Sequence, residues 1–279
     1  MVNQALPLRA LRFIRDKVVY RFVMASRFSS RSLANLRRGS QKDFFITIAF
    51  NDSRLTSLQL QALRNYVQGD VTLLIVDNSN KKSRSSEIRK VATQFGGRYV
   101  RAPRNLFSFF DPSLSHASTL DWVWKRLLVP LSPRRVVFLD HDIFPVATFS
   151  VDDFFLNREL VGFREERAEM WYLWPGLLGL DLTKITRRDL SFLPYRELDT
   201  GGSLWGSIYK NRGNSEVRFI TKETHVILPG TFKQQTSVEI LDGSWLHLID
   251  GSGWMDGKQK LDRMGSLNDL LELLPLSRD

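Results

Sequence analysis

From residue 43 onward, short apolar runs alternate with longer segments in which apolar residues recur at helical spacing. The apolar runs predict four strands, over residues 43–52, 71–80, 98–105 and 134–145. Most of these runs are apolar on both sides, as in strands covered on both faces. The segments between them predict three helices, over residues 53–69, 81–97 and 115–133. This alternation predicts a mostly parallel, Rossmann-like α/β sheet flanked by helices.

Glycine and proline mark where the predicted helices end. Gly69 and Gly96-Gly97 close the first two helices, because glycine adopts the left-handed conformation that often ends a helix. The third helix must end before Pro130 or Pro133, since the residue that precedes a proline disfavours helical backbone.

Polar residues follow three of the predicted strands. These tails are Asn51-Asp52, Asp77-Asn78-Ser79 and Asp140-His141-Asp142. In a parallel sheet, ligands bind at the carboxyl ends of the strands, near the point where the strand order reverses. We therefore expect the three tails to share one crevice. Their acidic groups need a partner there, either a hydrated divalent cation or the hydrogen-bond donors of a ligand.

The Asp-His-Asp tail has a spacing suited to a cation. In an extended chain, residues i and i+2 point the same way, so Asp140 and Asp142 can face one ion while His141 points elsewhere. Carboxylate oxygens favour Mg²⁺ or Mn²⁺. A strand end followed by a turn would also explain the two aspartates. The position of the motif after the fourth predicted strand is what favours a metal site.

Composition narrows the class of protein. At 279 residues and 32.3 kDa, the chain is long enough for one large α/β domain with appendages. It has no cysteine, which excludes disulfides, thiolate metal sites and a cysteine nucleophile. The lack of cysteine favours a reducing compartment, and we expect a cytoplasmic protein, at the cytoplasmic face of a membrane.

The formal charge of +10 belongs to one end of the chain. Residues 1–42 hold ten Lys and Arg and a single acid, Asp16, whereas the remaining residues hold 30 basic and 29 acidic side chains. The near-neutral body argues against a nucleic-acid partner. Within the basic end, helical spacing relates five apolar residues: Leu8, Leu11, Ile14, Val18 and Phe22. Three interpretations stay open, namely a peripheral membrane helix, a helix that caps the domain, and a transit peptide.

The order of three motifs resembles that of the nucleotide-sugar-dependent glycosyltransferases of the GT-A fold, especially the inverting family 2. The motifs are FFITIAFND, LIVDNSN and the Asp-x-Asp of VVFLDHDIF. The resemblance covers residues 43–255. It divides the chain into a basic N-terminal extension (1–42), a GT-A domain (43–255) and a C-terminal helical tail (256–279).

The resemblance implies roles for the strand tails. It places Asn51 and Asp77 near the base and ribose of the donor, with Asn78 and Asp52 beside them. Asp52 serves equally well as a helix cap. The metal ligands would be Asp142 and Asp140, the latter with a ribose contact as its alternative, and His247 would complete the coordination.

The resemblance also implies an acceptor side with a catalytic base. Asp199, before Thr-Gly-Gly, matches the base that takes the proton of the acceptor hydroxyl, with Glu197 as second choice and helix capping as the other interpretation of Asp199. Arg104 and His116 are the expected cationic contacts of the pyrophosphate. One of three aromatic residues is expected to line the sugar site: Trp171, Tyr172 or Trp174.

The leading hypothesis is therefore a metal-dependent glycosyltransferase. It would use Mn²⁺ or Mg²⁺ and a nucleotide-diphosphate sugar, act on a hydroxyl of a glycan or lipid-linked acceptor, and invert the anomeric centre. One alternative is a sugar-nucleotide nucleotidyltransferase, which would be expected to carry a glycine-rich phosphate loop where this chain has FNDSRLTS. A second alternative is a nucleic-acid-binding protein that uses the basic arm.

Overall fold

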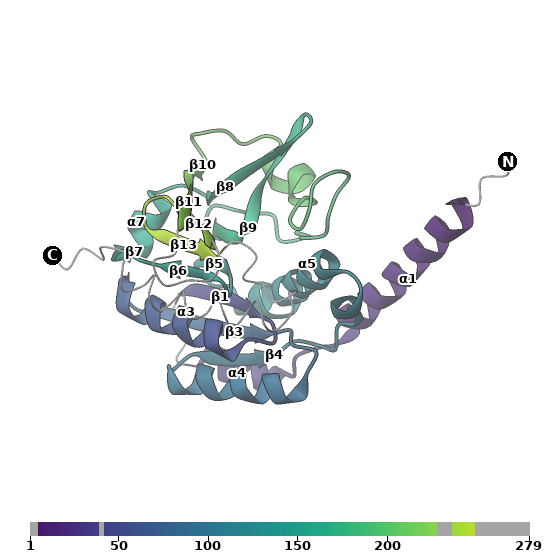
Figure 1. Ribbon diagram of the computed structural model, residues 1–279, viewed down its shortest axis with the longest axis horizontal. Coiled ribbons are helices and arrows are strands. Elements are labelled where there is room, and N and C mark those ends of the chain that lie inside the picture. The colour runs from purple at the N-terminus through teal and green to yellow at the C-terminus, as the bar shows by residue number, and fades with distance from the viewer. Residues whose placement is uncertain (1–4, 39–41, 228–235, 249–279) are drawn as a thin grey trace.

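The computed structural model describes residues 5–38, 42–227 and 236–248 (Figure 1). A mostly parallel sheet of seven strands forms its centre, in the order β10-β8-β9-β5-β1-β3-β4. The strands are β1 (Asp43–Ala49), β3 (Val71–Asp77), β4 (Arg98–Arg101), β5 (Arg135–Asp140), β8 (Leu160–Arg167), β9 (Met170–Asp181) and β10 (Val217–Phe219). β5, β1, β3 and β4 are parallel, whereas β9 runs antiparallel to both β5 and β8. The fold class expected from the sequence is confirmed.

Helices cover both faces of this sheet, because successive side chains of each strand point to opposite sides. Along β1, Phe44 and Ile46 pack in one apolar cluster with α5 (Pro112–Val123) and with the end of α1 (Ala5–Ala25). Phe45 packs in the other cluster, with α3 (Ser53–Tyr66), α4 (Lys82–Gln94) and α7 (Val151–Phe155). Burial on both faces explains why the strands read as continuous apolar runs.

A second sheet begins where a single strand was expected over residues 134–145. β5 ends at Asp140, His141 and Asp142 form a turn, and β6 (Ile143–Pro145) joins a different, four-stranded sheet. Its other strands are β13 (Trp245–Leu248), β12 (Thr236–Leu241) and β11 (Lys222–Ile227). The single-strand prediction is wrong because β6 pairs with β13, a strand about 100 residues further along the chain.

One predicted helix end differs from the one observed, and the third helix ends before Pro133, the later of its two predicted limits. α3 stops at Tyr66, before Gly69, because β2 (Val67–Gln68) pairs with β7 (Phe149–Ser150). The third helix passes through Pro130 as α5, a π-helical turn η2 (Trp124–Leu128) and α6 (Val129–Leu131). A proline lacks the N–H of a regular helix, and the π turn before it accommodates the break. The chain leaves the helix at Ser132, before Pro133.

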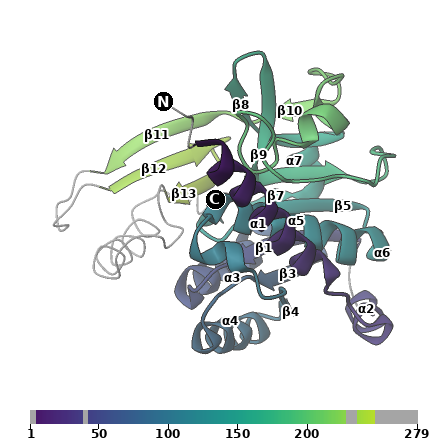
Figure 2. The same cartoon turned by 90° about the vertical axis from the view of Figure 1, so that its right-hand side faces the viewer.

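The N-terminal extension is helical. α1 crosses one side of the body and projects beyond it, and the chain then continues into α2 (Ser30–Arg37) (Figure 2). Val19 and Val23 are buried where α1 packs against α5. Of the helices described, none is both long and apolar enough to cross a membrane. The predicted C-terminal tail, residues 256–279, lies outside the described residues.

A buried carboxylate fixes α1 to the body. Asp121, on α5, is fully buried and accepts hydrogen bonds from the Tyr20 hydroxyl (2.7 Å), the Lys125 ammonium (3.1 Å) and the Ser191 hydroxyl (3.0 Å). The backbone N–H of Phe192 also donates to it. These bonds join α1, α5 and the loop after β9.

We expect Asp121→Ala to lower the free energy of unfolding by about 3 kcal/mol, because the substitution leaves several donors without their shared acceptor. Urea denaturation followed by circular dichroism measures this change. Asp189→Ala is the matched control, since Asp189 is exposed and pairs with Arg187 at the surface. Equal stability of the two variants would contradict the anchoring role.

Candidate active site

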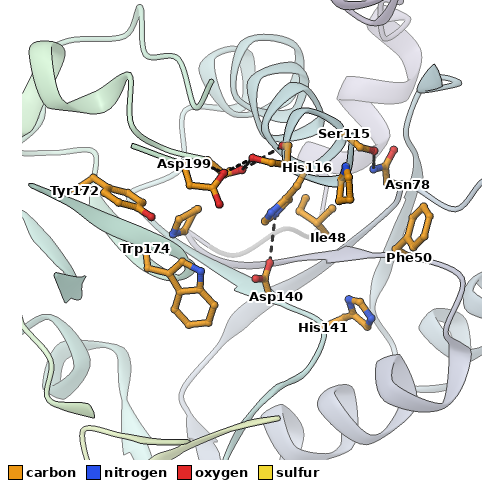
Figure 3. A pocket seen from close by; sticks show the side chains of 14 residues that line it. Ile48, Phe50, Asn78, Ser115, His116, Asp140, His141, Tyr172, Trp174 and Asp199 are labelled. Atoms are coloured by element: carbon orange, nitrogen blue, oxygen red, sulfur yellow. Dashed lines mark hydrogen bonds and ion pairs between the residues drawn. The ribbon is translucent and has the colours of Figure 1, made fainter. Parts of the chain in front are cut away.

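A pocket opens at the carboxyl edge of the main sheet, between the ends of β1 and β5. The strand order reverses here, because β3 lies on one side of β1 and β5 on the other. Such switch points are where open α/β sheets bind ligands. The cavity measures about 310 Å³ (Figure 3). Its walls are formed by Ile48, Phe50, Asn78, Pro112, Ser113, Ser115, His116, Asp140, His141, Tyr172, Trp174, Pro175, Asp199 and Thr200.

The first turn of α5 forms one wall. Asp111 caps this helix and Pro112 occupies its first turn, a combination that starts helices efficiently. His116 projects from the helix toward the end of β5, where its Nε2 lies 3.3 Å from Asp140 Oδ1 (Figure 3). The positive end of the helix dipole and this imidazole both favour an anion at this wall. His116 and Asp140 thus line the pocket, as the site prediction requires.

The Asp-His-Asp tail is arranged differently from the prediction. Asp140 and His141 line the pocket, whereas Asp142 is buried and does not. The expected alternation of side chains fails because β5 ends at Asp140 and the next two residues form a turn. His141 is therefore a pocket residue that the spacing rule for extended strands assigned to the other side.

Asp142 and His247 affect each other's pKa through their charges. Burial raises the pKa of Asp142, and the nearby His247 and His141 oppose this effect only in part. Burial by itself lowers the pKa of His247, but its hydrogen bond to Glu239 and the charge of Asp142 outweigh burial and raise that pKa. The His247 Nδ1 atom lies 2.7 Å from Glu239 Oε2, and its ring packs on Trp174 at 4.8 Å between centroids.

These residues fit a divalent cation by chemistry. Asp142 Oδ1 is buried and has no hydrogen-bond partner in the described part of the chain. Glu239 is hydrogen-bonded to Nδ1 of His247. A carboxylate in that position orients a metal-binding histidine, whose Nε2 atom would then be available to the ion. Within residues 5–38, 42–227 and 236–248, however, no three His, Cys, Asp or Glu side chains already lie together as a metal site. The ligand set Asp140, Asp142 and His247 stays a prediction.

The tails of β1 and β3 meet at the same edge. The backbone N–H of Asn51 donates to the Ser79 hydroxyl (2.8 Å), and Asn51 Nδ2 donates to Asn80 Oδ1 (2.8 Å). Asn78 lines the pocket, with its Nδ2 donating to the Ser115 hydroxyl (3.0 Å). The convergence expected of the three strand tails is thus present in the structure.

Two aspartates of these tails are engaged in local structure. Asp52 caps α3 by accepting hydrogen bonds from the N–H groups of Arg54 and Leu55 (both 3.0 Å), which settles its role as a cap. The Asp77 carboxylate is fully buried and does not line the pocket. Its four partners are the Ser79 N–H, the hydroxyls of Ser85 and Tyr99, and the Arg101 guanidinium. A nucleoside contact by Asp77 stays a prediction that would require one of these partners to leave.

Orphaned polar atoms are concentrated at this edge. In the described residues, five buried side-chain polar atoms have no hydrogen-bond partner. Four of them belong to the strand tails: Asn51 Oδ1, Asn78 Oδ1, His141 Nε2 and Asp142 Oδ1. Because buried polar atoms are normally satisfied, such a cluster indicates a place where a ligand supplies the missing partners.

Asp199 forms the wall opposite the strand tails (Figure 3). It is exposed, and its Oδ1 accepts hydrogen bonds from the Ser113 hydroxyl and from the Thr200 N–H (2.7 Å). Both bonds orient the carboxylate and leave the side chain open to the cavity. Glu197 is also exposed but does not line the pocket.

β9 brings two aromatic side chains to the pocket. Tyr172 and Trp174 are two residues apart, so they share one face of the strand and line the cavity. Trp171 points the other way and stacks on Tyr209 at 5.2 Å between centroids, in the core. Burial, followed by the charge of Asp199, raises the pKa of Tyr172 to about 12, so its hydroxyl is neutral beside that carboxylate.

Two residues of the pocket were not predicted from the sequence, and one predicted residue does not line it. Ser113 and Thr200 both donate hydrogen bonds to Asp199. Ser113 is 86 residues away along the chain, and Thr200 is the next residue. The Asp111-Pro112 pair that starts α5 is a sequence signal that could have indicated Ser113. Arg104 is exposed and does not line the pocket, so its contact with a pyrophosphate stays a prediction.

Comparisons with known proteins add a fold likeness. No protein-family model and no curated protein match this sequence. A similar solved structure is glucosyl-3-phosphoglycerate synthase from Mycobacterium tuberculosis with Mn²⁺, uridine diphosphate and glucosyl-3-phosphoglycerate. It is 16% identical over 69% of this chain and 73% of its own, with a TM-score of 0.43.

A second similar structure is a mannosyltransferase from Pyrobaculum calidifontis with GDP-mannose and Mn²⁺. It is 13% identical over 63% of this chain and 55% of its own, with a TM-score of 0.37. These values are too low to assign an activity, which therefore depends on the geometry of the pocket.

Proposed function

We propose that this chain is a glycosyltransferase that moves a sugar from a nucleotide-diphosphate sugar to a hydroxyl of a glycan or lipid-linked acceptor. The supporting observation is the pairing of two features across one pocket. Orphaned polar atoms gather at the strand tails, and an exposed, oriented carboxylate, Asp199, lies on the opposite wall. The first suits a polar ligand rich in donors, and the second suits a general base.

The donor would bind along the strand tails. The unpaired oxygens of Asn51 and Asn78 can accept hydrogen bonds from a nucleobase and ribose. Phe50, also in the wall, offers a ring face against the base. The diphosphate would then lie toward His116 and the first turn of α5, where the imidazole and the helix dipole favour negative charge.

A divalent cation fits this scheme because Asp140 and Asp142 would otherwise repel the diphosphate. Asp140, Asp142 and His247 would hold it, with Glu239 orienting the imidazole. When bound, such an ion neutralises charge on the departing nucleoside diphosphate.

Asp199 acts on the acceptor. Its carboxylate takes the proton of the acceptor hydroxyl as the oxygen bonds to the anomeric carbon of the sugar. The bond from that carbon to the diphosphate oxygen breaks, and its electron pair leaves with the nucleoside diphosphate. Ser113 and Thr200 hold Asp199 in one orientation throughout, which reduces the cost of ordering the base. Attack from the face opposite the leaving group inverts the anomeric configuration.

The first test is a thermal-shift panel of UDP, GDP and dTDP, each with Mn²⁺. A ligand at about 100 times its Kd stabilises a protein by about 2.7 kcal/mol. For a chain of this size, we expect one nucleotide to raise Tm by roughly 5–10 °C, an increase that EDTA abolishes. An unchanged Tm with all three nucleotides would contradict the proposal. Pyrophosphate release from a nucleoside triphosphate and a sugar 1-phosphate would instead support a nucleotidyltransferase.

A further inference from the structure

The outward face of α1 carries a stripe of apolar side chains. Leu11, Ile14, Val18 and Phe22 are 62%, 56%, 61% and 56% exposed. Their spacing of three, four and four residues places them on one side of the helix. Isolated exposed apolar residues are common, but four in a row along one helix indicate a contact surface.

The body of the protein fixes the direction of this stripe. Val19 and Val23 bury a different face of α1 against α5, and the Tyr20 hydroxyl is bound to the buried Asp121. Because these contacts hold the helix in one rotation, the stripe does not exchange with the buried face. The helix itself projects beyond the body (Figure 1).

Two aromatic residues extend the stripe toward the pocket. Phe109, at the end of η1 (Leu106–Phe109), is 61% exposed, and Phe110 is 43% exposed. The Arg15 guanidinium lies 4.0 Å from the centre of the Phe110 ring. Arg15 follows Leu11 by one helical turn and precedes Val18 by three residues, so it links the stripe to the aromatic pair. We call these six apolar residues, Leu11, Ile14, Val18, Phe22, Phe109 and Phe110, the α1–Phe109 surface.

The exposed charges on α1 beside this surface are almost all positive. Arg12, Arg15, Lys17 and Arg21 are exposed on the same helix, and the only acid among them, Asp16, is paired with Arg15. An apolar stripe between basic side chains suits an anionic lipid bilayer, in which the apolar groups enter the acyl region and the arginines meet the headgroups. A second copy of this chain would bring the same positive charge and would be repelled.

We propose that the α1–Phe109 surface docks the protein onto anionic membranes, with α1 lying in the plane of the interface. The surface reaches the active site, because Ser113 follows Phe110 by three residues, lines the pocket and donates a hydrogen bond to Asp199. Docking therefore holds the Asp199 wall next to the bilayer. Of the acceptors in the proposed function, on which this step rests, the lipid-linked one suits that orientation.

Co-sedimentation with vesicles tests the docking on the full chain. We expect binding to vesicles that contain phosphatidylglycerol, little binding to pure phosphatidylcholine, and release at about 1 M salt. Leu11→Glu/Val18→Glu should weaken binding at least tenfold. Val129→Glu/Leu156→Glu is the matched control, since it changes two exposed apolar residues elsewhere and alters the charge equally. Equal binding of the two double variants, or no binding by the wild type, would overturn the proposal.

Other occupants of the surface give different results. Dimers in sedimentation velocity that dissociate only in Leu11→Glu/Val18→Glu would identify a second copy as the partner and overturn the proposal. The proposal would also be overturned if the wild type bound DNA or RNA in a filter assay but did not bind vesicles, and if Leu11→Glu/Val18→Glu lost the nucleic-acid binding. Circular dichroism and Tm of both double variants should match the wild type, because none of the four side chains is buried.

Fluorescent labels test the orientation on the membrane. Because the chain has no cysteine, a single introduced cysteine is labelled specifically. Single variants Val18→Cys, Phe109→Cys and Leu156→Cys would carry an environment-sensitive dye. With anionic vesicles, we expect a blue shift of the emission at the first two positions and none at the third. A shift at Leu156, or none at Phe109, would overturn the orientation. The membrane assays contain no nucleotide, and the thermal-shift panel of nucleotides contains no lipid. A failure of membrane docking can therefore be distinguished from a failure of the proposed transferase function.

Discussion

Asp199→Asn is expected to lower kcat for sugar transfer about 10²- to 10⁴-fold, the usual contribution of a general base. Asparagine keeps an oxygen that can accept the hydrogen bonds of Ser113 and Thr200, so the local structure should be retained. It cannot take the proton of the acceptor. We therefore expect the nucleotide-induced increase in Tm to be unchanged while transfer is lost.

Glu197→Gln is the matched control for this experiment. Glu197 is exposed, lies two residues away and does not line the pocket, so its variant should keep transfer close to that of the wild type. Radiolabelled sugar incorporated into acceptor, measured for the wild type and both variants, separates the two. Full activity of Asp199→Asn, or loss of activity in Glu197→Gln alone, would remove Asp199 as the base.

Asp142→Asn is expected to lower metal-dependent turnover about 10²- to 10³-fold without reducing the stability of the metal-free protein. Asp142 is buried, its Oδ1 has no partner among the described residues, and burial raises its pKa. A carboxyl group whose pKa rises on folding destabilises the folded state at pH values above its unfolded pKa, and this cost shrinks as the pH falls toward that value. The neutral amide avoids the cost.

Two measurements distinguish this outcome from simple unfolding. In EDTA, Tm of Asp142→Asn should equal or exceed that of the wild type near neutral pH, and the difference should shrink as the pH falls. In Mn²⁺, the nucleotide-induced increase in Tm should be lost. Asp189→Asn serves as the control, because Asp189 is exposed, pairs with Arg187 at the surface and does not line the pocket. Retention of a full Mn²⁺-dependent shift by Asp142→Asn would show that Asp142 holds no metal.

Much of the site could be anticipated, because strand ends are readable and parallel topology brings them together. Asn78, His116, Asp140 and Asp199 all line the pocket, although they are separated by up to 121 residues of chain. Asn78 and Asp140 lie at the ends of apolar strands, and His116 lies near the start of α5, where polar side chains reach the edge of the sheet. The functional roles of these residues stay predictions.

Other parts of the site depend on neighbours that no local pattern reveals. Asp77 has the same sequence context as Asp140, yet it is buried, because Tyr99 and Arg101 from β4 reach its carboxylate. His141 enters the pocket because β5 ends one residue before it, and β6 then pairs with β13. Pairing of distant strands decides both outcomes.

The sequence by itself determined the alternation of strands and helices, the parallel class of the main sheet, and the confinement of positive charge to the N-terminal end. These properties follow from the spacing of apolar residues and from composition, both of which act over short stretches of chain. Only the tertiary structure decided which face of α1 is outward and which carboxylates are free. These depend on which distant side chains arrive to bury or bind a group, as Asp121 does for Tyr20 and Ser113 does for Asp199.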